Sequence, residues 1–399
     1  MTIDINAVFD SGNIEVVDAR DHRNLQLKIR PDPYTPRDKT AHFQWFHYRV
    51  SNAHNMPLTM IITNANESSF PVAWPGYKCC ASYDTIRWFR VDTKYDQKRG
   101  TITIKHTPEQ DSTYFSYFAP YTYSRHRELV ARMQGKSCVR LEVVGNTVEG
   151  RSMDLLIIGA PESRKHRIWI VARQHPGESM AEWFMEGFLE NLTDEHSAFA
   201  RRTLQHAVFY VVPNMNPDGS LRGHLRTNAK GANLNREWAN PTLGYSPEVY
   251  HVLNKMDKTG ADLFLDIHGD EEIPFNFLAG QEGIPSFDNR LKQLAKTFME
   301  AFERATPDFQ AKPGYDVDEP GQADLSIASN AVGERFHCLA FTLEMPFKDT
   351  EDSPDAVYGW SPERAKRFGA CILNPIYETL PDLKDNPEAE GNARKRPKP

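Results

Sequence analysis

"IWIVARQHPGESMAEWFMEGFLENL", residues 168–192, contains the transition that decides the fold. It opens with a continuous apolar run, breaks at His-Pro-Gly-Glu-Ser, and resumes with Met180, Phe184, Phe188 and Leu192 spaced four residues apart. The apolar run is typical of a strand covered on both faces, and the four-residue spacing is typical of a helix with one apolar side. The stretch therefore predicts a strand, a turn and a covering helix, as in α/β domains.

Three more apolar runs have the same character: "HAVFYVVP" at 206–213, "ADLFLDIHG" at 261–269 and "CLAFTLEMP" at 338–346. Residues 288–305 form a second helical pattern, with apolar side chains on one side at Leu291, Leu294, Phe298 and Phe302. This alternation predicts a mixed, mostly parallel central sheet with helices on both faces. We expect the α/β domain to span residues 119–380.

The first 118 residues have a different pattern. Short aromatic or β-branched runs, such as "LTMIITNA" and "TITIKH", are separated by turn-rich stretches. Several such runs predict an all-β sandwich domain over residues 1–118. The polar, proline-punctuated residues 381–399 predict a disordered tail.

Composition narrows the class of protein. The 399 residues include 47 Lys and Arg against 54 Asp and Glu, and the formal net charge is −7. This charge indicates no surface for nucleic acid, and no apolar stretch reaches the ~20 residues that cross a membrane. Five cysteines without a C-x-x-C pair predict reduced thiols. Without a signal-peptide pattern, we expect a cytoplasmic protein with small-molecule or peptide partners; its oligomeric state stays open.

His175 and Glu178 stand three residues apart at the opening break, past a strand and at the start of a helix. Sites in open α/β sheets form beyond the carboxyl ends of the strands, so both side chains can reach one crevice. Imidazole nitrogen and carboxylate oxygen are typical zinc ligands. The alternative interpretation is a histidine satisfied at a turn, with Glu178 favouring the helix dipole.

Two other histidines have a glutamate three residues later. His106 and Glu109 follow a short strand of the sandwich region without further ligands nearby, so we set them aside. His268 ends the strand "LFLDIHG" and is expected to reach the same crevice as His175. Two histidines with Glu178 and one open position predict a catalytic site for one zinc ion.

Water activated at such a site needs a base. Glu344 is the lone acid of the apolar run "CLAFTLEMP", and a buried carboxylate is costly enough to indicate a function. Alternatively, the strand ends at Leu343 and Glu344 meets solvent. Glu271, in the loop beyond His268, is expected in solvent rather than on the metal.

The segment at 214–238, "NMNPDGSLRGHLRTNAKGANLNREW", has the composition of a long functional loop. Arginine binds carboxylates in bidentate fashion and polarises carbonyl oxygen. Arg226 and Arg236 are therefore candidates for these two tasks, and Asn235 adds amide donors.

The motifs "HPGES", "NPDG", "LRTN", "GANLNREW", "LDIHG" and "FTLEM" occur in this order and resemble the zinc carboxypeptidase family. The preceding sandwich and the joining "FAPYTYSRH" resemble the cytosolic carboxypeptidases in particular. The resemblance covers residues 40–380. It implies a metallocarboxypeptidase that releases C-terminal residues from peptides or proteins. Glu344 is then the general base and proton donor, Arg226 stabilises the oxyanion, and Asn235 and Arg236 bind the terminal carboxylate.

The sequence also departs from the family pattern. Asn233 stands where secreted members have an aspartate behind a zinc-bound histidine. Asp270 stands where eukaryotic cytosolic members have a second histidine, so their glutamate-chain substrates do not transfer directly. The tyrosine that closes over substrate has no clear match, and Tyr315 is left unassigned.

Three alternatives stay open from the sequence. The nearest is a zinc amidohydrolase of the same fold that acts on N-acyl amino acids. The second is a non-catalytic binding module with the sandwich as its working part, although a binding protein needs no base. The third is a structural zinc site, which is usually cysteine-rich and closed by four ligands.

Overall fold

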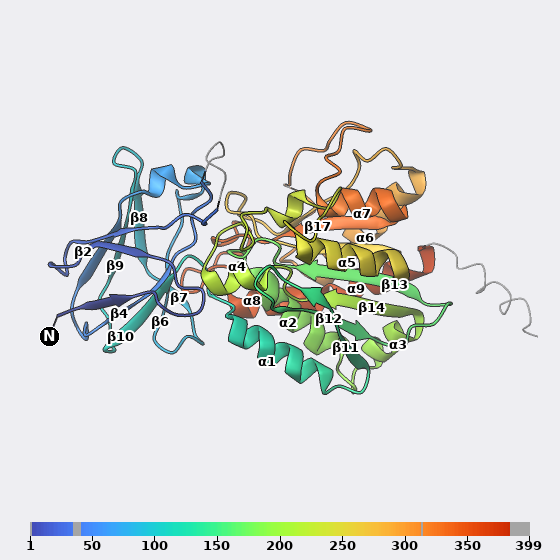
Figure 1. The fold of residues 1–399 in the computed structure, drawn as a ribbon, viewed down its shortest axis with the longest axis horizontal. Helices are drawn as coiled ribbons and strands as arrows, with labels where there is room; N and C mark the ends of the chain where they lie inside the picture. Colours follow the sequence, from blue (N-terminus) through green and yellow to red (C-terminus); the bar gives the residue numbers. More distant parts are fainter. Residues whose placement is uncertain (1, 35–40, 313, 384–399) are drawn as a thin grey trace, which may run out of the picture.

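The computed structural model describes residues 2–34, 41–312 and 314–383 (Figure 1). The β-rich N-terminal part lies at one end of an elongated molecule, and the α/β part lies at the other. Most of the predicted disordered tail, residues 384–399, lies outside the described residues.

The N-terminal part contains two five-stranded sheets, as the short strand patterns predicted. The first sheet has the order β1 (Asp4–Asn6), β4 (His47–Ser51), β10 (Ser112–Ser116), β6 (Cys80–Ser82) and β7 (Phe89–Arg90). The second has the order β2 (Glu15–Asp18), β3 (Leu25–Lys28), β5 (Leu58–Ile62), β9 (Thr101–His106) and β8 (Asp92–Asp96). Alternate residues of β5 and β9 are buried, because successive side chains of a strand point to opposite faces.

A seven-stranded mixed sheet forms the centre of the α/β part. Its order is β11 (Val139–Asn146), β12 (Ser152–Ile158), β14 (Ala207–Val212), β13 (His166–Ala172), β15 (Leu263–Ile267), β17 (Leu339–Glu344) and β16 (Phe277–Ala279). The four strands from β14 to β17 are parallel, and they are the four apolar runs of the sequence. Antiparallel strands flank them on both sides. The predicted fold class is confirmed.

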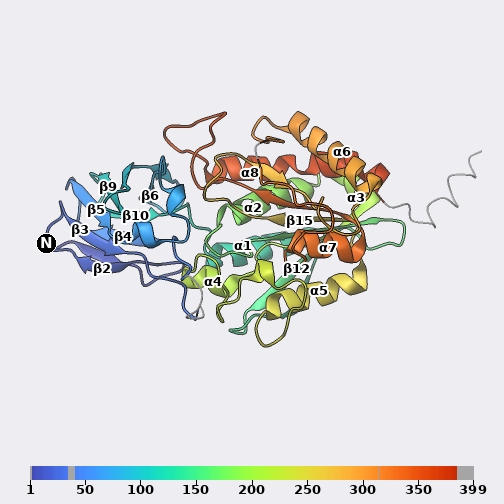
Figure 2. The same ribbon diagram turned by 90° about the horizontal axis from the view of Figure 1, so that it is seen from above.

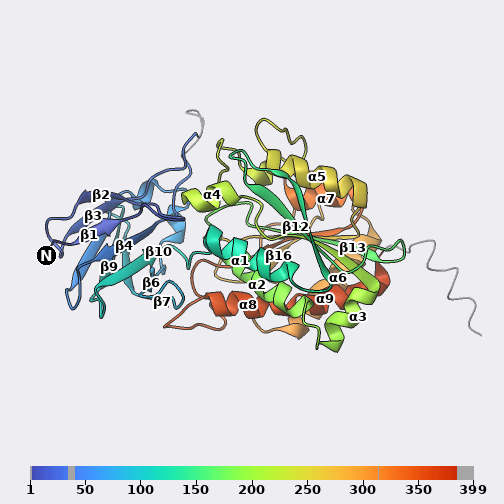
Figure 3. The same cartoon turned by 60° about the horizontal axis from the view of Figure 1, so that its bottom comes forward.

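Helices cover both faces of this sheet (Figures 2 and 3). One face carries α5 (Pro247–Thr259) and α7 (Ala328–Phe336). The other face carries α2 (Met180–Leu192), α6 (Asn289–Ala305), α8 (Pro362–Cys371) and α9 (Leu373–Thr379). The remaining helices are α1 (Tyr123–Gln134), α3 (Ala198–His206) and α4 (Pro217–Arg222). Both predicted helical patterns are confirmed, since the periodic apolar side chains of α2 and α6 are buried.

Side chains on the two faces of strand β13 pack into two different hydrophobic cores. Ile168 and Ile170 join the core under α2, whereas Trp169 and Val171 join the core under α5 and α7. The first of these cores continues without a break into the N-terminal sheets, so the two parts of the chain share apolar packing. In the described part of the chain, all five cysteines are free thiols and no helix is long and apolar enough to cross a membrane.

Candidate active site

The ends of two neighbouring parallel strands bring the predicted metal ligands together. His175 follows β13, His268 follows β15, and Glu178 lies two residues before α2. All three are buried, and one ligand atom from each lies within 4.8 Å of the others. The residues therefore converge as the strand-end argument predicted.

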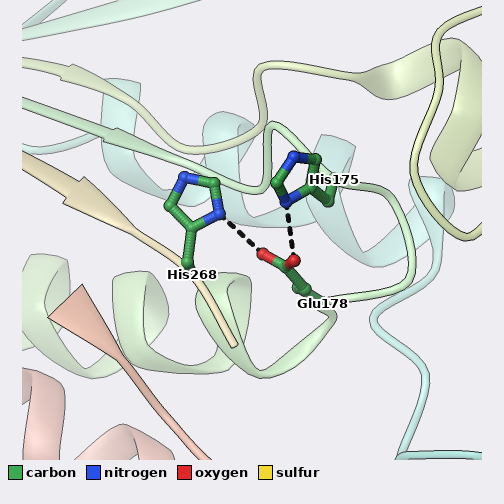
Figure 4. Close-up of side chains that lie close together, drawn as sticks. All are labelled: His175, Glu178 and His268. Atoms are coloured by element: carbon green, nitrogen blue, oxygen red, sulfur yellow. Dashed lines mark hydrogen bonds and ion pairs between the residues drawn. The ribbon is translucent and has the colours of Figure 1, made fainter. Parts of the chain in front are cut away.

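Glu178 lies between the two histidines, as Figure 4 shows. Its Oε1 is 2.6 Å from Nδ1 of His175, and its Oε2 is 2.7 Å from Nδ1 of His268. The far ring nitrogens also have polar neighbours: Nε2 of His175 is within hydrogen-bond distance of Oδ1 of Asn233 at 3.0 Å, and Nε2 of His268 lies 2.8 Å from Oδ2 of Asp266 as an ion pair. Such outer partners fix ring orientation, so both Nδ1 atoms are directed at one point beside Glu178.

The turn that carries His175 is held by a buried arginine. Arg173 has a positive φ of 57° and no exposed surface. Its guanidinium donates to the carbonyl oxygen of Pro176 at 2.9 Å and to that of Tyr121 at 2.6 Å, and it pairs with Glu182 at 2.5 Å. These bonds satisfy the buried charge and hold an otherwise unfavourable backbone conformation.

The electrostatics of the cluster suit a cation. Burial lowers the pKa of His175 to about 3, with the nearby charge of Arg226 acting in the same direction, so its imidazole is neutral. Burial opposes charge on His268, but the carboxylates of Asp266 and Glu178 raise its pKa well above the usual value. The pKa of Glu178 is lowered by both histidines despite its burial. Two imidazoles and one ionised carboxylate, converging in a buried pocket, fit a zinc ion.

Glu344 ends β17 beside this cluster and is only 7% exposed, so the alternative of a solvent-facing carboxylate is wrong. Burial raises its pKa well above the usual value, and the charges of Glu178, Asp270 and Asp266 add to the shift. Its Oε2 has no hydrogen-bond partner within the described residues. An unsatisfied buried carboxylate oxygen is costly, and Glu344 lines the same cavity as His175 and Glu178.

Arg226, Asn235 and Arg236 line that cavity, whose volume is about 710 Å³, together with His175 and Glu344. Oδ1 of Asn235 accepts a hydrogen bond from the amide of Ala328 at 2.9 Å. The Arg236 guanidinium donates to the carbonyl oxygen of Asn235 at 2.7 Å. Partial burial and the neighbouring charge of Arg226 lower the pKa of Arg236. Two arginines that repel one another across a cavity form a favourable place for an anion.

Tyr315, to which the sequence assigns no role, lines the cavity. Its hydroxyl donates to Oδ2 of Asp270 at 2.6 Å and lies 3.3 Å from Oε1 of Glu344. Burial and these carboxylates raise the pKa of Tyr315, which keeps the hydroxyl protonated as a donor. No local pattern points to this residue, because its partners lie far away in the sequence.

The expectation that Glu271 meets solvent is wrong. It is 5% exposed, lines the cavity, and has its pKa raised first by burial and then by the charge of Glu178. The reason is that the chain beyond β15 continues beside the β17 segment. The amide of Asp270 donates to the carbonyl oxygen of Met345 at 2.8 Å, which keeps the next residue inside. By contrast, His106 bonds to the hydroxyl of Tyr83 at 3.0 Å, in the N-terminal part.

Comparisons with known proteins identify the family of this chain. Residues 5–118 match the cytosolic carboxypeptidase N-terminal domain, and residues 127–365 match the zinc carboxypeptidase family. An uncharacterised protein of Zymomonas mobilis is 50% identical over 96% of this chain and 98% of its own length. Cytosolic carboxypeptidase 6 of Mus musculus is 29% identical over 69% of this chain, which spans about half (54%) of that relative.

A solved structure shares the whole architecture. A metallo-carboxypeptidase from Pseudomonas aeruginosa, in complex with (2-guanidinoethylmercapto)succinic acid, is 45% identical with a TM-score of 0.91, over 96% of this chain and 100% of that one. The chain therefore belongs to the zinc carboxypeptidase family of peptide hydrolases, with the N-terminal domain found in cytosolic carboxypeptidases.

Proposed function

We propose that this protein is a zinc-dependent exopeptidase that removes C-terminal residues from peptides or proteins. One observation carries the proposal: His175, Glu178 and the unsatisfied carboxylate of Glu344 line a single cavity that also contains two arginines, and His268 converges on Glu178 at 2.7 Å. We propose one zinc ion per chain, held by His175, Glu178 and His268.

Zinc at these ligands supplies a Lewis acid that polarises the scissile carbonyl and makes water more acidic. Glu344 accepts a proton from the attacking water as the new C–O bond forms. It returns that proton to the amine nitrogen as the C–N bond breaks. Arg226 donates hydrogen bonds to the carbonyl oxygen as negative charge grows there, a role supported by its place in the cavity beside the ligands.

Arg236 and Asn235 bind the free C-terminal carboxylate and thereby select the last peptide bond. Two observations support this role. Both residues line the cavity, and the positive charge of Arg226 helps to lower the pKa of Arg236, so a bound anion would offset the repulsion between the two arginines.

A free terminal carboxylate should be required for cleavage. In a series of benzoyl-glycyl dipeptides, amidation of the terminal residue should lower kcat/KM by about 100-fold or more, because the charged pair with Arg236 is lost. Rates are followed by release of the terminal residue. Arg236→Ala should lower cleavage of the free acid and leave the poor rate on the amide unchanged. Equal rates on both substrates would exclude carboxylate recognition.

We propose that the cavity prefers a basic terminal side chain over an acidic one. Within the described residues, the wall that follows β16 and α6 carries three carboxylates and one cation: Glu282, Asp316, Asp318 and Lys312. The Pseudomonas relative binds a ligand whose name contains a guanidino group, which is consistent with such a wall.

An Arg-terminated dipeptide of the same series should therefore have a kcat/KM about 10-fold above its Glu-terminated counterpart, which corresponds to ~1.4 kcal/mol. Glu282→Gln should narrow this ratio, while Glu300→Gln, an exposed change on α6 outside the cavity, should leave it as it is. Faster cleavage of the Glu-terminated peptide would contradict the proposed preference.

The alternative activity on N-acyl amino acids is not favoured, because the chain matches the N-terminal domain of the cytosolic carboxypeptidases. Benzoyl amino acids without the glycine should accordingly be poorer substrates than the dipeptides. We also propose a domain boundary at residues 118/119, a catalytic domain that ends near residue 380, and a cytoplasmic location. The matches over 5–118 and 127–365 support the division.

A further inference from the structure

Residues of the N-terminal domain hold the segment that carries Arg226. This segment follows α4, which lies beside the N-terminal sheets (Figure 3). The amide of Ser11 donates to the carbonyl oxygen of Leu221 at 2.8 Å, and Nδ2 of Asn13 donates to that of Gly223 at 3.0 Å. Gly223 has φ 71°, and a Cβ there would lie 2.7 Å from the Ser11 carbonyl oxygen. The two backbones therefore approach closely just before Arg226.

Asp32 extends this contact to Arg226 itself. Its Oδ1 accepts from the amide of Leu225 at 2.6 Å. Its Oδ2 accepts from the amide of Arg226 at 2.8 Å, and from the amide and hydroxyl of Thr227 at 2.9 and 3.1 Å. The residue is 4% exposed, so a charge costly to bury is offset by donors from three successive residues. These bonds fix the backbone from which the Arg226 side chain reaches the cavity.

A second residue of the same domain contacts the Arg226 side chain. The Phe70 ring lines the active-site cavity, and its centroid lies 5.7 Å from Cζ of the Arg226 guanidinium. Phe70 is itself anchored, because its amide donates to Oε1 of Gln44 at 2.8 Å. An aromatic face at this distance attracts a guanidinium and limits its rotamers.

We propose that the N-terminal domain completes the active site by aiming Arg226, with Asp32 as the main positioning residue and Phe70 as the second. This inference rests on the proposed role of Arg226 at the carbonyl oxygen. Asp32 does not line the cavity, and it acts on Arg226 through the segment at 225–227. The domain is then needed for turnover, beyond any contribution to folding or to recruitment of substrates.

A double-mutant cycle separates positioning from mere structural support. Asn at position 32 would turn one amide donor toward a backbone donor, which displaces the segment. Asp32→Asn should lower kcat on the fastest-cleaved benzoyl-glycyl dipeptide by about 10- to 100-fold with KM changed less than about threefold. Arg226→Ala should lower kcat by about 100- to 1,000-fold. In the Arg226→Ala background, Asp32→Asn should cost less than about twofold, because the residue it positions is gone.

Asp262→Asn is the matched control. Asp262 is also 4% exposed and also accepts a backbone hydrogen bond, from the amide of Arg167 at 2.8 Å. It precedes β15, at the end opposite His268, so its loss should lower stability without changing kcat. If Asp32→Asn does not fold, Phe70→Leu takes its place in the cycle. Phe70→Leu alone should lower kcat about threefold to tenfold, and it should not lower kcat further when Arg226→Ala is already present.

The outcomes are distinct. An equal fold-loss from Asp32→Asn in both backgrounds, or an unchanged kcat, would overturn the positioning role and leave the proposed function standing. An unchanged kcat in Arg226→Ala itself would instead overturn the role proposed for Arg226, and this inference with it.

Discussion

Replacement of Glu344 by glutamine should lower kcat by about 1,000-fold, because the amide keeps the size and burial of the side chain but cannot accept the proton of the attacking water. Neither can it pass a proton to the leaving amine. KM should change little, since Glu344 binds neither the terminal carboxylate nor the carbonyl oxygen in the proposed mechanism. Steady-state kinetics on the free-acid dipeptides measures both parameters.

Glu272→Gln provides the control for this change. Glu272 is exposed, lies in the loop past His268, and does not line the cavity. It should therefore keep the wild-type rate. Zinc content measured on each variant should match that of the wild type, since neither residue is a proposed ligand. A Glu344→Gln protein that retains zinc and turns over within about threefold of wild type would exclude Glu344 as the general base.

Loss of the metal should lower activity at least as much as Glu344→Gln does. Dialysis against 1,10-phenanthroline should lower kcat/KM on the order of 1,000-fold or more, and one equivalent of zinc per chain should restore it. His268→Ala should have the same effect and resist restoration, because it removes one of three ligands and leaves Glu178 short of a partner. Metal content and rate are measured on the same samples.

The matched control for the ligand change is His106→Ala. His106 has the same spacing to a glutamate as His175, but it bonds to Tyr83 in the N-terminal domain and lies outside the converging cluster. This variant should keep both zinc and activity. Full activity in the chelated enzyme, or in His268→Ala, would contradict metal-dependent hydrolysis.

The parts of the fold that could be predicted are those with a strong periodic signal. The four parallel strands of the central sheet are long apolar runs, and α2 and α6 repeat apolar residues at helical spacing. The edge strand β11 gave no comparable signal, because all of its residues are partly buried or exposed and it has no continuous apolar run. Strands of three or four residues, such as β1 and β6, are too short to stand out from a turn-rich background.

The converging ligands could be predicted because topology decides where strand ends lie. His175, His268 and Glu344 each follow or end a parallel strand, so one rule of sheet architecture gathers them. The same rule did not predict that Tyr315 and Glu271 line the cavity. Tyr315 arrives from a loop without regular structure, and Glu271 is kept inside by a backbone pairing between Asp270 and Met345 that no residue pattern announces.

The proposed positioning of Arg226 by the N-terminal domain could not be predicted from the sequence either. Asp32 precedes Arg226 by 194 residues, and a lone aspartate in a proline-rich stretch has no feature that marks it as a ligand for backbone amides. Only the packed arrangement of the two domains brings its carboxylate to the segment at 225–227.

The most direct test of whether His175, Glu178 and His268 bind one zinc ion is anomalous scattering at the zinc absorption edge. It is measured on crystals of the purified protein. We predict one peak per chain, about 2.0–2.2 Å from one nitrogen each of His175 and His268 and from a Glu178 carboxylate oxygen. A peak held by other residues, or zinc-saturated crystals without a peak at these three, would contradict the proposed metal centre.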